Sequence, residues 1–110
     1  MFDGLWILEF SSTINRYGRG VLVINKNRLL GGDDAYYYSG NCKIDGDKIE
    51  GSVRVIRYDP LAPSVFGDDL DHFKILFKGK IDKYSFSAIG TLVGDATAQI
   101  RIDGIKKENL

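Results

Sequence analysis

The sequence contains very few of the residues that build metal sites, disulfides and activated nucleophiles. Its 110 residues include one cysteine, Cys42, and one histidine, His72. A single cysteine excludes an intramolecular disulfide and any metal site made of several cysteines. A Cys42–His72 pair is formally possible, but nothing around Cys42 marks it as an activated thiol. We therefore expect no catalytic residue, no cofactor and no metal, and a protein that is not an enzyme.

An excess of charge of one sign and a long apolar run are also missing. Lys plus Arg and Asp plus Glu number 15 each, so the formal net charge is zero, and no overall field attracts nucleic acid or an anionic membrane. The apolar stretch at residues 5–10 is short and contains Glu9. It does not resemble a signal peptide, and it falls far below the ~20 residues of a spanning helix. We predict a cytoplasmic protein that binds no nucleic acid directly and does not insert into a membrane.

Instead of helical spacing, the chain shows alternation of apolar and polar residues. Trp6, Leu8 and Phe10 alternate with polar neighbours such as Glu9, which is typical of an antiparallel sheet with one buried face. The residues that this pattern places in the interior are Trp6, Leu8, Phe10, Val53, Val55, Phe73, Ile75, Phe77 and Phe86.

Turn signals separate these runs at nearly regular intervals. They fall at residues 15–18, 25–27, 45–47, 82–83 and 94–95, and Asp45-Gly46-Asp47 is the strongest of them. Only residues 59–71, with Pro60 and Pro63, form a longer connection. Residues 1–110 are thus predicted to form one all-β domain, a single antiparallel up-and-down barrel of seven or eight strands. Glycines inside the strand patterns fit the bends that curl such a sheet. A sandwich that changes sheets at residues 59–71 is the alternative.

Paired carboxylates and clustered tyrosines are the remaining candidates for function. The carboxylates at residues 33–34, 45–47 and 68–71 lie in or beside predicted turns, where Asp side chains bind the local backbone. Tyr36, Tyr37 and Tyr38 place rings on both faces of one strand. Their acidic flank, Asp33-Asp34, argues against stacking on single-stranded nucleic acid. We expect the outward rings of Tyr36, Tyr37 and Tyr38 to lie in a dimer or partner interface.

From Gly4 to about Ile81 the chain resembles a family of small regulatory barrels. The matching elements, in order, are Gly4-Leu5-Trp6, Gly18-x-Gly20-Val21-Leu22, Gly31-Gly32-Asp33, Tyr38-x-Gly40, Asp45-Gly46-Asp47, Arg57-Tyr58 and Pro63-Ser64-Val65. The chain is similar in these to the GrlR family, lipocalin-like barrels that act as negative regulators of type III secretion gene expression.

The resemblance implies a cytoplasmic eight-stranded barrel that is often a homodimer and works by sequestering a protein such as a transcriptional activator. The family's acidic partner-binding loop corresponds here to a turn with fewer carboxylates, formed by Asp45, Gly46, Asp47 and Glu50. The alternative function is a lipocalin-like carrier of an apolar small molecule or lipid, because an eight-stranded barrel is wide enough for one small ligand. The predicted inward residues are bulky, so we expect a mostly filled interior.

Overall fold

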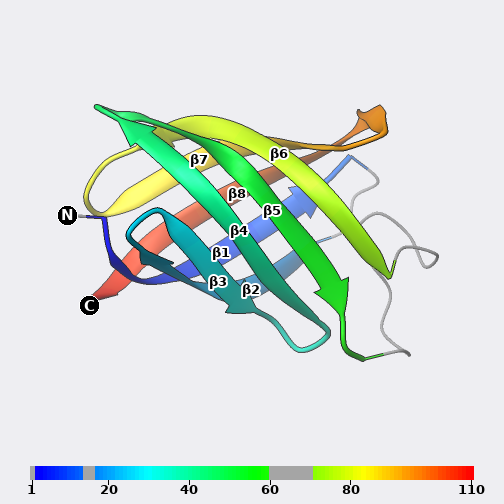
Figure 1. The fold of residues 1–110 in the computed structure, drawn as a ribbon, viewed down its shortest axis with the longest axis horizontal. Helices are drawn as coiled ribbons and strands as arrows, with labels where there is room; N and C mark the ends of the chain where they lie inside the picture. The colour runs from blue at the N-terminus through cyan, green and yellow to red at the C-terminus, as the bar shows by residue number, and fades with distance from the viewer. Residues whose placement is uncertain (1, 14–16, 60–70) are drawn as a thin grey trace.

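A computed structural model describes residues 2–13, 17–59 and 71–110, and they form a closed antiparallel barrel (Figure 1). The strands are β1 (Gly4–Ser12), β2 (Tyr17–Asn25), β3 (Arg28–Gly32), β4 (Tyr36–Asp45), β5 (Lys48–Arg57), β6 (His72–Ile81), β7 (Ser85–Leu92) and β8 (Asp95–Asn109). Each strand pairs with the next, and β8 pairs with β1. The predicted up-and-down barrel is confirmed with eight strands, and the sandwich alternative is wrong because the β1–β8 pairing closes one sheet. Nowhere in the described ranges does a helix occur that is long and apolar enough to cross a membrane.

The short turns lie where the sequence predicts them and have the backbone geometry that their residues favour. Lys26 and Asn27 both have positive φ, 51° and 69°, as the two central residues of a type I′ hairpin turn do. Gly46 and Gly94 also have positive φ, 62° and 98°. β2 begins at Tyr17, within the turn predicted at residues 15–18. The predictions for residues 15–16 and for most of the 59–71 connection lie outside the described residues.

Glycines inside the strands allow neighbouring backbones to approach closely. A Cβ atom on Gly40 would lie 2.1 Å from the Ser52 carbonyl oxygen, and one on Gly79 would lie 2.0 Å from that of Ser87. Both distances are far below a van der Waals contact, so a larger residue at either position would push the strands apart. Glycine at these two positions thus permits the close spacing of neighbouring strands.

Trp6 fills one end of the barrel. It is 0% exposed, its Nε1 donates a hydrogen bond to the Phe2 carbonyl oxygen at 3.0 Å, and its ring centroid lies 5.3 Å from that of Phe86. The β2–β3, β4–β5 and β6–β7 turns surround this end, which is the left end in Figure 1. We call it the Trp6 end, and we call the opposite end, which carries the β3–β4 turn, the Asp33 end.

Candidate functional site

The barrel interior contains a cavity of about 190 Å³ that extends towards the Asp33 end. Every residue predicted to point inwards lines this cavity, except Trp6, which lies beyond it. The interior thus keeps a cavity beside its packed core, whereas we expected it to be mostly filled. On β2, the inner positions Gly18 and Gly20 carry no side chains. The Phe10 ring and the Tyr38 hydroxyl lean into the space that Cβ atoms there would take, at 2.3 and 2.7 Å.

The wall of the cavity is largely apolar. Leu8, Leu22 and Ile75 represent the aliphatic part, and Phe73 and Phe77 the aromatic part. Such a surface offers water few hydrogen-bond partners, and a buried water normally makes about three. The cavity is thus suited to an apolar group.

Asp33 supplies a polar group on the cavity wall, at the end opposite to Trp6. Its Oδ1 accepts hydrogen bonds from the backbone N–H groups of Ala35 at 2.9 Å and Tyr36 at 2.8 Å. Its Oδ2 accepts a short hydrogen bond from the Tyr38 hydroxyl. The Tyr58 hydroxyl donates to the Asp33 carbonyl oxygen. The carboxylate is thus held in one orientation beside the cavity.

Tyr38 remains a neutral hydrogen-bond donor in this arrangement. Burial raises the pKa of its phenol, and the hydrogen bond to the Asp33 carboxylate raises it further. Sequence reasoning assigned Asp33 to a turn and Tyr38 to a surface, and so missed this pair. The only feature of the sequence that could have indicated this contact is that Asp33 precedes Tyr38 by five residues, with Asp33 in the turn before the strand that carries Tyr38.

Two arginines near the Asp33 end are engaged with acidic or aromatic neighbours. Arg57 Nε lies 3.0 Å from the Tyr36 hydroxyl and 3.3 Å from the Asp71 carboxylate, and its guanidinium lies over the Tyr36 ring. Arg19 lines the cavity and lies 3.4 Å from the Glu9 carboxylate, with both side chains exposed. Each guanidinium group thus lies beside a carboxylate that does not line the cavity, Asp71 for Arg57 and Glu9 for Arg19.

The tyrosine strand is divided between the two faces of the sheet. Tyr36 and Tyr38 are buried in the interior, whereas Tyr37 is 45% exposed on the outside. The prediction that all three belong to a partner surface is therefore corrected, because alternate residues of a strand point to opposite faces. Only Tyr37 is available to an external partner.

The turn with Asp45, Gly46, Asp47 and Glu50 is exposed at the Trp6 end. Tyr37 lies near the other end of β4. At about 3.3 Å per residue, the eight steps along the strand from Tyr37 to Asp45 span roughly 25 Å. The structure therefore does not join these two predicted surfaces into one.

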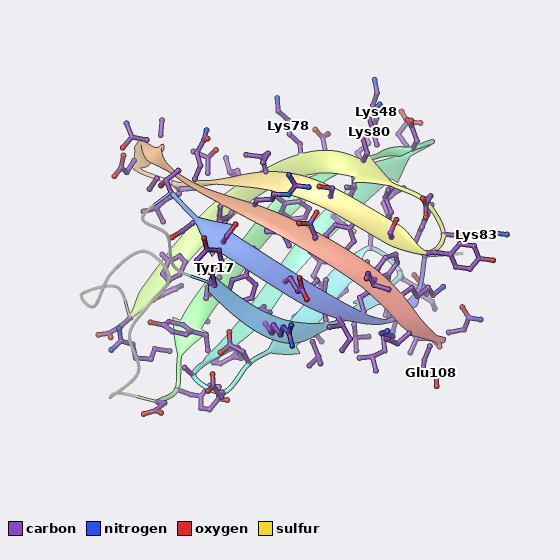
Figure 2. All side chains as sticks on the ribbon, turned by 180° about the vertical axis from the view of Figure 1, so that it is seen from behind. Tyr17, Lys48, Lys78, Lys80, Lys83 and Glu108 are labelled. Atoms are coloured by element: carbon purple, nitrogen blue, oxygen red, sulfur yellow. The ribbon has the colours of Figure 1, made fainter. Side chains whose placement is uncertain are left out.

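Lysines surround this turn on the outer face of the barrel. Lys48 pairs with Lys80 in the β5–β6 register, and Glu50 pairs with Lys78. Lys80 Nζ lies 3.5 Å from the Asp47 carboxylate. Figure 2 shows Lys48, Lys78 and Lys80 projecting outwards from the same edge. The turn is a surface of mixed charge rather than an acidic patch.

The candidate catalytic pair is not assembled. Cys42 is buried inside the barrel towards the Trp6 end, and burial raises the pKa of its thiol. His72 is exposed at the start of β6, towards the Asp33 end. Within the described ranges, no group of three or more His, Cys, Asp or Glu residues is placed to hold a metal ion.

Comparison with known proteins shows the fold and no family. No family model matches the chain, and no curated protein matches it. Among solved structures, a redesigned beta barrel is similar, with a TM-score of 0.67 and 12% identity over 97% of this chain and 92% of that one. At this identity the likeness shows a shared barrel architecture alone.

Proposed function

We propose that the barrel binds a small, largely apolar molecule in its interior. The observation that carries this proposal is the cavity of about 190 Å³ between Trp6 and the Asp33 end. An engineered cavity of ~150 Å³ with a similar apolar lining binds benzene, so one aromatic ring or a short alkyl group fits this volume. Tyr17 and Asp34 line the cavity and are exposed. The cavity therefore reaches the surface, and one end of a ligand can extend to solvent.

The driving force for binding is the removal of apolar surface from water. Each Å² of apolar surface buried contributes about 25 cal/mol. The wall is already shaped by buried residues such as Leu22, Phe73 and Ile75. A preformed wall reduces the ordering cost of binding.

The test is a titration with toluene, followed through the backbone amide resonances. We expect saturable shifts at residues that line the cavity on β1, β5 and β6. Val53→Phe places a larger ring in the cavity and should abolish these shifts. Val21→Phe is the matched control, because Val21 is exposed on the outer face. Circular dichroism establishes that both variants fold. No saturable shift in the wild type, or unchanged binding by a folded Val53→Phe, would overturn the proposal.

A second candidate function is protein binding of the kind that the GrlR resemblance implies, with a second copy of this chain as the first partner. It is supported by apolar side chains on the outer face of β2–β4. Gly32 on β3 pairs with Val21 on one side and Tyr37 on the other, and Leu30 lies on the same face of β3. The side chains of Val21, Tyr37 and Leu30 are 44–48% exposed. Adjacent exposed apolar groups of this kind mark protein interfaces.

Sedimentation velocity tests this second candidate. We expect a wild-type dimer that Leu30→Lys converts to a monomer, because a charge at the centre of the apolar face opposes its burial. Leu76→Lys is the matched control, since Leu76 is exposed to a similar extent, 53%, but lies on β6 among lysines. A wild type that stays monomeric at high concentration would rule out the dimer.

A further inference from the structure

We propose that the Asp33 end of the cavity selects a ligand whose polar end is positively charged, a small aromatic or aliphatic amine, over one that ends in a carboxylate. This inference rests on the proposed function, because it assigns a ligand class to the same cavity. It goes further in predicting the chemical group that lies at the Asp33 end.

The charges on the cavity wall favour a cation. Among the described lining residues, the charged side chains are Arg19, Asp33 and Asp34. Arg19 lies 3.4 Å from the Glu9 carboxylate, so its charge is shared with a group outside the cavity. The two consecutive carboxylates leave an excess of negative charge at this end. Apolar walls beside them reduce solvent screening and strengthen their attraction for a cation.

The hydrogen bonds of Asp33 favour a donor in the ligand. An ionised carboxylate offers about four acceptor positions and no donor. The N–H groups of Ala35 and Tyr36 and the hydroxyl of Tyr38 occupy three such positions. A ligand ammonium group can use the remaining capacity of the carboxylate, and charge-assisted bonds of this type are about twice as strong as neutral ones.

The one cationic side chain on the described wall that could meet a ligand carboxylate is Arg19, and it already lies 3.4 Å from the Glu9 carboxylate. The Tyr38 hydroxyl already donates its proton to Asp33. Arg57 Nε is directed towards the Tyr36 hydroxyl and the Asp71 carboxylate instead. A carboxylate at this end would meet the like charge of Asp33 and Asp34, and it would lose part of its hydration.

The experiment compares three probes that share a phenyl ring and a two-carbon chain. They are phenethylamine, 2-phenylethanol and 3-phenylpropionate, titrated at pH 7 with the amide resonances as the readout. We expect the amine to bind at least about tenfold tighter than the carboxylate, a difference of ~1.4 kcal/mol, with the alcohol between them. The ratio should fall as salt is added, because this end of the cavity reaches solvent.

Two variants and one control assign the preference to the Asp33 end. Asp34→Asn removes the exposed carboxylate charge. Asp33→Asn removes the charge of the second carboxylate but keeps a side-chain oxygen that can accept the hydrogen bonds from the N–H groups of Ala35 and Tyr36. Each should reduce the amine-to-carboxylate ratio. Asp45→Asn makes the same charge change in the turn at the Trp6 end and should leave the ratio unchanged.

The outcomes separate this inference from the function on which it rests. Equal affinity for the three probes, tighter binding of the carboxylate, or a ratio unaffected by both variants would overturn the selectivity and leave cavity binding intact. If neither toluene nor any of the three probes binds, the proposed function itself is overturned, and the selectivity is overturned with it.

Discussion

Trp6 is the residue whose replacement should damage this barrel most. Its side chain is fully buried, it packs against Phe86, and its indole N–H satisfies the Phe2 carbonyl. Trp6→Ala removes the ring that separates the cavity from the Trp6 end. The loss would join new empty volume to the existing 190 Å³, and the surrounding sheet is too constrained by strand pairing to collapse onto it.

The expected magnitude follows from the area and the volume that are lost. A buried Trp covers about 150–250 Å². At ~25 cal/mol per Å² this corresponds to roughly 4–6 kcal/mol relative to full exposure. Measured Phe or Trp to Ala substitutions in cores cost about 3–5 kcal/mol, and we expect Trp6→Ala to lie in that range. This is a large part of the ~5–15 kcal/mol that stabilises a typical domain.

Urea denaturation followed by far-UV circular dichroism measures this cost, because the substitution removes the chain's only tryptophan. Trp6→Phe keeps a ring but loses the hydrogen bond to Phe2, and it should cost less than Trp6→Ala. Tyr17→Ala is the exposed control and should change stability by no more than about 0.5 kcal/mol. In the wild type, Trp6 fluorescence should be shifted to the blue. If Trp6→Ala lowered the free energy of unfolding by less than ~1 kcal/mol, Trp6 could not be buried as described, because burial of a side chain of this size alone contributes more than that.

Three further predictions concern charge and reactivity. Hydrogen bonding from Arg101 holds the pKa of Asp103 below its ordinary value, so this pair stabilises the fold above the unfolded-state pKa of about 4. That contribution is lost as pH falls through the lower folded-state pKa, and Asp103→Asn should flatten the acid limb of a urea-denaturation series. Burial raises the pKa of Cys42, so iodoacetamide should modify the native protein at pH 7 much more slowly than the urea-unfolded chain; equal rates would contradict the buried position. Asp45→Lys combined with Asp47→Lys retains the turn glycine and should leave the circular dichroism spectrum unchanged. If the turn docks a basic partner, the double variant should weaken binding of polylysine at low salt, and unchanged binding would remove the turn from the partner surface.

Features that depend only on neighbouring residues could be predicted from the sequence. Alternation with a period of two placed Leu8, Phe10 and Phe77 in the interior, because successive residues of a strand must point to opposite faces. Gly46 and Asn27 marked turns for an equally local reason, since they tolerate the positive φ that those turns adopt. Fold class and the inward residues were therefore predictable without knowledge of which strands close the barrel.

The contents of the interior depend instead on how all the strands are arranged in space. The pairing of Gly4 with Asn109 closes the sheet, and the curl of that sheet sets how far opposite walls stand apart. Phe10 and Tyr38 lean over Gly18 and Gly20, and a cavity of about 190 Å³ remains although the residues around it are bulky. Periodicity indicates which face a side chain occupies, but the volume left between facing side chains depends on distances that the three-dimensional arrangement of all the strands sets.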